Sequence, residues 1–432
     1  MRVIVGVDTH ADTHHVAVVT EHGRPLADRE YVATGYGYRK ITEFARSYGE
    51  VAAVGVECTG NYGAGLTKVL RSEGLTVVEV NRPNRQERRL QGKSDPLDAY
   101  QAAQAVLAER CTAVPKDKDG PVECMRLLRA SRSSAMKART AAINQIKDLM
   151  VSASEVIRAK YRGMVTSAMI TTMARAKPAG HLADPVHVTA WTLKKLARRY
   201  QSLTEEIAEA DSALKEILDA YAPLLCDLPG VGVEVASQLL VTMGDNRERV
   251  GSEAQFAALA GVAPIPASSG KTSRHRLSRG GDRNANKALH HVVLVRMGSD
   301  ARTKEYVAKR TLEGKGKREI MRCLKRYVAR ELYRQIMHPV PAPVISDLRP
   351  LRRQLGLTLQ NAAEHLNQWP LYLSRLERGQ TRNDSLIAKY RQWLDEQAPG
   401  AGWQSSAPIP TGPFRRGLQS SENLLGDLQW RS

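Results

Sequence analysis

The chain is poor in cysteine, in aromatic residues and in long apolar runs. Five cysteines are scattered over 432 residues, and none forms a CxxC pair. Neither a disulfide framework nor a zinc site is therefore expected, and the pattern is typical of a reduced, cytoplasmic protein. Aromatic residues make up only 5% of the chain, which argues against a surface that stacks the bases of single-stranded nucleic acid.

No apolar segment is long enough to cross a bilayer, and a strand pattern interrupted at Asp8 stands where a signal peptide would lie. Acidic residues are fewer than basic ones. The chain has 45 Asp and Glu and 64 Lys and Arg, which gives a net charge of +19. This charge favours a polyanionic partner, DNA or RNA rather than a membrane. The length predicts two to four domains.

Two apolar, β-branched runs each end in a carboxylate. Residues 3–7 precede Asp8, and residues 51–56 precede Glu57. Such runs are typical of strands buried on both faces of a sheet. A carboxylate at the end of a buried strand is costly unless a cation or hydrogen bonds compensate it.

A second acidic pair, Asp95 and Asp98, lies at the start of a predicted helix. Ser94 is a candidate N-cap and Pro96 falls in the first turn, so both carboxylates can share one helix face. Taken singly, each acid could be a turn former or a helix cap. Their joint occurrence instead favours a metal site, and oxygen donors suit Mg²⁺ or Mn²⁺.

Residues 1–115 alternate between strand and helix patterns. Residues 3–7 and 15–19 predict a hairpin, and a third strand follows the turn at residues 23–25. Further elements are predicted at residues 38–48 (helix), 51–56 (strand), 63–73 (helix), 76–80 (strand) and 95–109 (helix). This order predicts a ribonuclease H-like, resolvase-like α/β domain.

The next two domains are predicted to be mostly helical. Residues 116–220 read as a long helical hairpin, with helices at 125–150 and 191–218. Its basic face could serve dimerisation or a nucleic-acid duplex, or could simply be solvated. In residues 221–338, Gly230 and Gly232 predict a helix-hairpin-helix turn that contacts phosphate, or an ordinary glycine-rich helix entry.

A segment downstream carries the pattern Gly-Val-Ala-Pro at 261–264, Ser-Gly at 269–270, and Arg-Gly-Gly at 279–281 followed by Asn286. Together with the acidic motifs and the helical middle, it resembles the DEDD transposases of minimal insertion sequences. These are relatives of the pilin-gene inverting recombinases, and some are directed by a structured bridge RNA. The resemblance covers about residues 1–335.

The resemblance implies specific roles. The family's four metal-binding acidic positions fall on Asp8, Glu57, Asp95 and Asp98. The family's nucleophilic serine, which becomes linked to a DNA 5′ phosphate, falls on Ser269, although the adjacent Ser268 leaves a one-residue ambiguity. A serine hydroxyl needs activation by a metal or a base, and the phosphate needs nearby positive charge. The candidate nucleic-acid contacts here are Lys271, Arg274, Arg276, Arg279, Arg283 and Lys287.

Acids in one domain and a serine in another suggest a composite site completed between protomers, so a dimer to tetramer is expected. The predicted partners are DNA at the element ends and target, and a structured guide RNA. Residues 302–334 hold twelve Lys and Arg against four Glu. We expect this helical segment to neutralise nucleic-acid phosphates.

Residues 345–395 closely resemble a phage-repressor-type helix-turn-helix, joined by a Pro-rich linker at 339–343. Thr358 is expected to cap its second helix and Gln360 to lie near the DNA backbone, while residues 368–374, with Tyr372 and Ser374, face the major groove. The alternative is a small helical dimerisation module. Trp369-Pro370 is atypical at the start of a recognition helix, and residues 396–432 are expected to be disordered.

The sequence thus predicts a metal-dependent, serine-using DNA transposase or recombinase with an added DNA-binding domain. One alternative is a resolvase-like nuclease that hydrolyses DNA with metal-activated water. Another is a DNA-binding regulator without catalysis.

Overall fold

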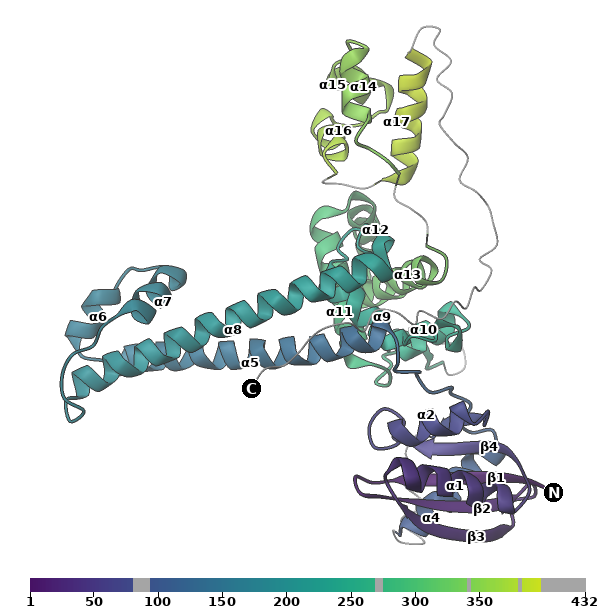
Figure 1. Ribbon diagram of the computed structural model, residues 1–432. Coiled ribbons are helices and arrows are strands. Elements are labelled where there is room, and N and C mark those ends of the chain that lie inside the picture. The colour runs from purple at the N-terminus through teal and green to yellow at the C-terminus, as the bar shows by residue number, and fades with distance from the viewer. Residues whose placement is uncertain (81–93, 269–274, 340–342, 380–382, 398–432) are drawn as a thin grey trace, which may run out of the picture. The chain divides into compact units, whose positions relative to one another are not determined.

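The computed structural model describes residues 1–80, 94–268, 275–339, 343–379 and 383–397 (Figure 1). The chain forms two compact units, Met1–Ala342 and Pro343–Ser432. Within these described ranges, no helix combines the length and the apolar character needed to cross a membrane.

The first unit begins with a five-stranded mixed sheet of order β3-β2-β1-β4-β5. Its strands are β1 (Arg2–Thr9), β2 (Thr13–Thr20), β3 (Pro25–Val32), β4 (Glu50–Glu57) and β5 (Val77–Val80). β1, β2 and β3 form an antiparallel meander, whereas β4 runs parallel to both β1 and β5. The predicted hairpin and third strand are confirmed.

Helices cover both faces of the sheet, as Figure 1 shows. On one face, α1 (Gly35–Ser47) and α2 (Ala64–Ser72) pack on a core that includes Val5 and Val7. On the other face, α4 (Asp95–Leu107) packs with Ile4. α1 begins before its predicted start because the Thr34 side chain accepts a hydrogen bond from the Gly37 amide and caps the helix.

The predicted helical hairpin consists of α5 (Pro121–Ser152) and α8 (Pro185–Tyr221). Two short helices that the sequence interpretation missed, α6 (Glu155–Tyr161) and α7 (Thr166–Arg175), lie between them and share a small core with the hairpin. α8 starts at Pro185 rather than at residue 191 because Asp184 caps two of its first amides.

A helical bundle completes the first unit. It contains α9 (Val233–Met243), α10 (Glu253–Leu259), α11 (Arg283–Ser299), α12 (Ala301–Leu312) and α13 (Lys317–Met337), with short strands β6 (Ile265–Pro266) and β7 (His275–Arg276) and the 3-10 turns η1 (Pro223–Leu225) and η2 (Arg247–Arg249). The predicted basic helical segment at 302–334 is thus two helices, α12 and α13. They are separated at Gly314, whose φ of +78° favours glycine.

The second unit holds α14 (Leu348–Gln354), α15 (Leu359–His365), α16 (Pro370–Glu377) and α17 (Asp384–Gln397) around one core. Thr358 caps α15 as predicted, and Asn361 completes a reciprocal capping box. α17 continues to Gln397, two residues into the segment predicted as a tail. The rest of that segment lies outside the described residues.

Candidate functional site

The ends of two parallel strands bring Asp8 and Glu57 side by side. Val7 of β1 pairs with Val56 of β4, so the next residue in each strand is an acid. The Thr9 hydroxyl donates to the main-chain oxygen of Glu57 at 3.1 Å, which ties the two strand ends together. Both acids are buried.

Both acidic side chains lie on the α4 face of the sheet. Gly6 and Gly55 each precede an acid by two residues, and side chains two apart in a strand share a face. A Cβ on Gly6 would lie 2.1 Å from the Ala99 carbonyl oxygen of α4, and one on Gly55 would also meet α4. The glycines thus show which face α4 covers.

The first turn of α4 carries the other two predicted acids. Asp98 is buried and Asp95 is half-exposed. Ser94 occupies the predicted N-cap position, although its hydroxyl makes no capping hydrogen bond. We call Asp8, Glu57, Asp95 and Asp98 the acidic cluster.

The electrostatics of Asp8 show that Asp95 and Asp98 of α4 lie near its carboxylate. Burial raises the pKa of Asp8, and repulsion from Asp98 and Asp95 raises it further, whereas His10 opposes the shift. Keeping Asp8 ionised in the folded protein therefore costs free energy, which a bound cation would offset. This environment and the oxygen donors of the acidic cluster fit a hard divalent cation.

His10 is a site residue that sequence reasoning did not identify. Its Nε2 lies 3.2 Å from Asp8 Oδ2 and 3.4 Å from Asp95 Oδ1. One ligand atom from each of these three residues falls within a common span of 4.8 Å. The spacing Asp8-Thr9-His10 was a usable signal, because alternate residues of an extended segment share a face.

The segment between β6 and β7, residues 267–274, carries the predicted nucleophile, and we call it the serine loop. It is only partly described. Ser269, Lys271 and Arg274 lie outside the described residues, and Ser268, just before the gap, is exposed. The loop is bounded by the paired strands β6 and β7, where Ile265 pairs with Arg276. The four remaining predicted basic contacts are all exposed: Arg276, Arg279, Arg283 and Lys287.

Asn286 of α11 holds the segment that leads into this loop. Its Nδ2 donates to the main-chain oxygens of Ala260 and Gly261 at 3.1 and 2.9 Å. Its Oδ1 accepts from Lys325 Nζ of α13 at 2.8 Å. The base of the serine loop is therefore fixed to the helical bundle.

The predicted phosphate-binding turn has the expected local form. Gly230 has a φ of +77°, and Gly232 is the N-cap residue of α9. The first turn of α9 also holds Glu234, whose carboxylate pairs with Arg129 at 2.9 Å and Arg132 at 3.3 Å from α5. This carboxylate lies in the helix turn that a phosphate would approach, and it also anchors α9 to the hairpin.

In the second unit, the predicted DNA-contacting residues have different environments. Gln360 is exposed and donates to the Glu364 carboxylate at 2.8 Å. Tyr372 and Ser374 of α16 are half-buried, and Tyr372 packs against the core. Trp369, at the N-cap of α16, is 81% exposed.

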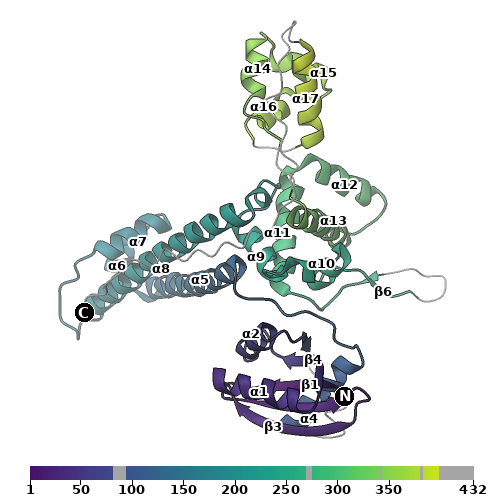
Figure 2. The same cartoon turned by 45° about the vertical axis from the view of Figure 1, so that its right-hand side comes forward.

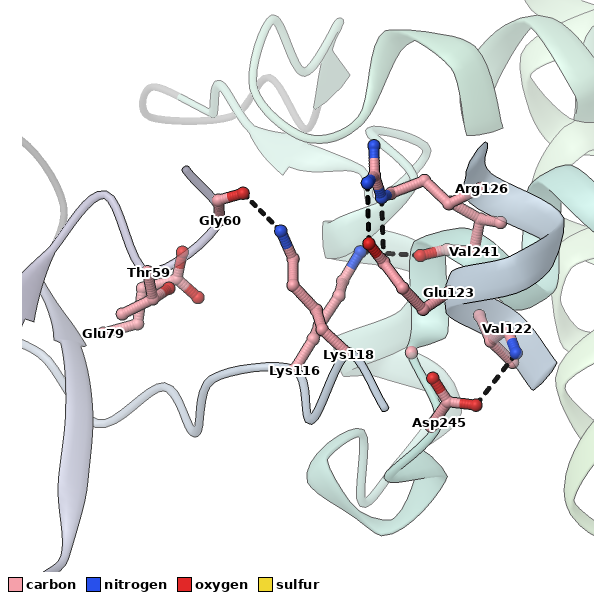
Figure 3. Close-up of a pocket in the computed structure, with 11 residues that line it drawn as sticks. Thr59, Gly60, Glu79, Lys116, Lys118, Val122, Glu123, Arg126, Val241 and Asp245 are labelled. Carbon is pink, nitrogen blue, oxygen red and sulfur yellow. Dashed lines mark hydrogen bonds and ion pairs between the residues drawn. The ribbon is translucent and has the colours of Figure 1, made fainter. Parts of the chain in front are cut away.

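A separate hollow of about 230 Å³ lies beside the segment that joins α4 to α5. Figure 3 shows Lys118 directed at the Gly60 carbonyl oxygen and Arg126 paired with Glu123. Glu79 lines the hollow and pairs in the sheet with Val56, so its side chain lies on the face opposite the acidic cluster. No member of the cluster lines this hollow.

Comparison with known proteins gives two family matches. A DEDD transposase family model matches residues 5–154. A model described as transposase IS116/IS110/IS902 family matches residues 222–308. The first range includes the whole acidic cluster, and the second includes the serine loop.

Three relatives are similar over parts of the chain. An uncharacterized 42 kDa protein of insertion element IS900 from Mycobacterium paratuberculosis is 27% identical over 159 residues, 36% of this chain and 40% of the relative. An uncharacterized 43.6 kDa protein of insertion element IS110 from Streptomyces coelicolor is 33% identical over 124 residues, 28% of this chain and 30% of the relative.

The transposase for insertion sequence element IS1328 of Yersinia enterocolitica is 24% identical over 300 residues, 68% of this chain and 84% of the relative. The chain thus spans less than half of the first two relatives and most of the third. From the two family matches, the chain carries transposase domains of the IS110/IS116/IS902 family, a DEDD domain in its N-terminal part and a second domain after the helical hairpin.

Proposed function

We propose that the chain is a transposase that cuts and rejoins DNA at the ends of an insertion sequence. The observation that carries this proposal is the acidic cluster. Asp8 and Asp95, together with His10, have ligand atoms within 4.8 Å of one another, and Asp98 lies near enough to Asp8 to raise its pKa. Glu57 ends the strand that pairs with β1. The family matches support the same class of reaction.

The acidic cluster is the proposed binding site for Mg²⁺ or Mn²⁺. When bound, the cation would polarise the attacking oxygen and neutralise charge on the phosphate. His10 orients Asp8 and Asp95 through its contacts with both carboxylates. The register of β1 and β4 fixes the separation of Asp8 and Glu57 before any ligand arrives.

Ser269 is the proposed nucleophile, with Ser268 as the neighbouring alternative. Its oxygen attacks the phosphorus of a DNA phosphodiester, and the bond to the 3′ oxygen breaks. The 5′ phosphate stays on the serine, and the released 3′ hydroxyl takes up the proton. Attack by another strand's 3′ hydroxyl then rejoins DNA and regenerates the serine. Arg276 and Arg279 follow the loop directly in sequence, and both are exposed. They would supply positive charge near the phosphate.

The proposed partners are DNA, a structured guide RNA and further copies of the chain. Acids and serine come from separate parts of the sequence, so a dimer or tetramer would complete the site. The four helices of the second unit are proposed to form a helix-turn-helix in which α16 enters the major groove. The capped start of α15 and the exposure of Gln360 support this role.

The test is to trap a covalent intermediate. Full-length protein is incubated with labelled element-end DNA and Mg²⁺ and then denatured. We expect a protein–DNA adduct that Ser269→Ala abolishes and Ser268→Ala retains, while Asp8→Asn prevents strand breakage but not DNA binding.

The control Asp12→Asn changes an exposed acid outside the acidic cluster and should retain adduct formation. Cleavage without an adduct would instead favour the nuclease that uses water, which the acidic cluster also fits. Tight binding without any cleavage would favour a regulator.

A further inference from the structure

One side of α13 carries a row of arginines at four-residue spacing. These are Arg322, Arg326, Arg330 and Arg334, all within Lys317–Met337. Like charges four residues apart destabilise a helix by a few tenths of a kcal/mol for each pair. The helix is held instead by its opposite side, where Leu324, Val328 and Leu332 enter the core.

Few carboxylates compensate this row. Glu253 lies 3.2 Å from Arg330 and 3.8 Å from Arg334. Among the described residues, no carboxylate forms an ion pair with Arg322 or Arg326, and the Arg322 side chain is exposed. This half of the row is therefore suited to an external anion.

Two tyrosines from adjacent helices stand beside the arginines. α12 packs against α13 (Figure 2), and Tyr306 meets Tyr327 edge to face with ring centroids 5.6 Å apart. Arg310 lies over the Tyr306 ring at 5.7 Å, and Arg330 lies over the Tyr327 ring at 6.0 Å. Tyr327 is 53% exposed, so part of its ring is open to a ligand.

Burial raises the pKa of Tyr306 to about 12, helped by Cys323 and Tyr327. The Tyr306 ring is neutral near pH 7 and packs against Tyr327 without adding negative charge. An exposed aromatic face among guanidinium groups is the combination that binds the base and the phosphates of an unpaired nucleotide. A duplex keeps its bases stacked internally, so it could use the arginines but not the tyrosine face.

We propose that α12 and α13 form a binding site for single-stranded nucleic acid, in which Tyr327 stacks on an unpaired base while Arg322 and Arg326 bind the flanking phosphates. This proposal rests on the proposed function because it assumes that the protein acts on nucleic acid. It adds that the protein binds unpaired nucleotides. The overall scarcity of aromatic residues argued against such a surface, but the fold gathers two tyrosines where the charge is highest.

The site also lies close to the base of the serine loop. Lys325 of α13 donates to Asn286, which holds Gly261. A strand bound along the arginine row would therefore pass near Lys325 and Asn286, which fix Gly261. Unpaired nucleotides arise from melted DNA ends or from loops of a folded RNA, and both present the same base face and phosphate charge.

The experiment measures binding of the full-length protein to labelled single strands by fluorescence anisotropy. The probes are oligo(dT), oligo(U) and a blunt DNA duplex of equal length, and a 2-aminopurine version of each single strand reports stacking. We expect Tyr327→Ala to weaken single-strand binding roughly 5- to 150-fold, the range for loss of one base–aromatic stack. Tyr327→Phe should restore it, and duplex binding should change little in either variant.

The control is Tyr36→Ala. Tyr36 is 62% exposed and lies 5.8 Å from Lys40 Nζ, so it matches Tyr327 in exposure and in cationic neighbour, but it lies on α1. This variant should bind single strands as the wild type does. Arg326→Ala should weaken binding and reduce its salt dependence.

Several outcomes would overturn the proposal. One is unchanged single-strand affinity in Tyr327→Ala, and another is absence of any 2-aminopurine quenching by the wild type. Loss of oligomers in Tyr327→Ala, measured by light scattering, would assign the surface to a protein contact instead. Preference for oligo(U) or oligo(dT) separates an RNA source from a DNA source. Failure of the adduct test with normal single-strand binding would reject the proposed chemistry alone.

Discussion

Replacing Gly6 by alanine should disable the acidic cluster without touching any acid. The new Cβ would lie 2.1 Å from the Ala99 carbonyl oxygen and 2.3 Å from the Ala103 amide nitrogen, both in the backbone of α4. No rotamer change can relieve a contact with backbone atoms. The helix itself must therefore move away from β1.

The size of the movement follows from the contact distance. Ordinary Cβ contacts begin at 3.4 Å and this one would be 2.1 Å, so α4 must move away by about 1.3 Å at Ala99. Asp98 lies one residue earlier on the same helix and would be displaced with it. Metal–ligand distances tolerate only about 0.2 Å, so divalent cation binding should be lost. Overpacking should also lower the free energy of unfolding by about 1–3 kcal/mol.

Isothermal titration with Mn²⁺ and thermal unfolding measure the two effects separately. The matched control is Gly35→Ala in the same domain, where the nearest atom to the added Cβ is a flexible arginine nitrogen at 3.8 Å. That variant should bind Mn²⁺ and unfold like the wild type. Wild-type Mn²⁺ affinity in Gly6→Ala would refute the argument that the approach of α4 sets the site.

Three further predictions concern stability. Arg352→Met should destabilise the second unit by about 3–5 kcal/mol, because it leaves the buried Glu377 carboxylate without the guanidinium group that now lies 2.7 Å away. Thermal unfolding measures this loss. The control Arg353→Met changes an exposed arginine and should have little effect. Thr358→Ala should cost about 1 kcal/mol by removing the cap of α15, which urea unfolding can measure. Mn²⁺ at a hundred times its dissociation constant should stabilise the metal-free protein by about 2.7 kcal/mol, and an unchanged melting temperature would contradict binding at the acidic cluster.

The N-terminal domain was predictable because its strands have strong local signals. Valine-rich runs and polar turns placed the strands, and the order of the elements indicated the mixed sheet that is observed. Two helices that the sequence did not indicate lie between α5 and α8. α6 and α7 are short and owe their stability to burial of Ile157 and Met173 against the hairpin, and such tertiary packing leaves little periodicity in seven to ten residues.

The acidic residues of the candidate site could be predicted from the sequence, whereas His10 could not. A carboxylate at the end of a buried strand conflicts with packing, so Asp8 and Glu57 stand out from sequence alone. A histidine two residues after Asp8 causes no such conflict, and only the turn that follows β1 brings His10 to Asp95. The aromatic site at Tyr327 could not be predicted for a related reason, since its partner Tyr306 comes from another helix.

The two central strands share a pattern that links the fold to the site. Gly6-Val7-Asp8 and Gly55-Val56-Glu57 lie in register, glycine beside glycine and valine beside valine. Each glycine lets α4 approach the sheet, each valine packs on the opposite face, and each acid then lies on the side of α4. A helix that crosses two adjacent glycines is fixed in height above the sheet, and this height sets how closely Asp95 and Asp98 of its first turn approach Asp8. The same three-residue pattern therefore specifies both where the helix packs and where the carboxylates converge.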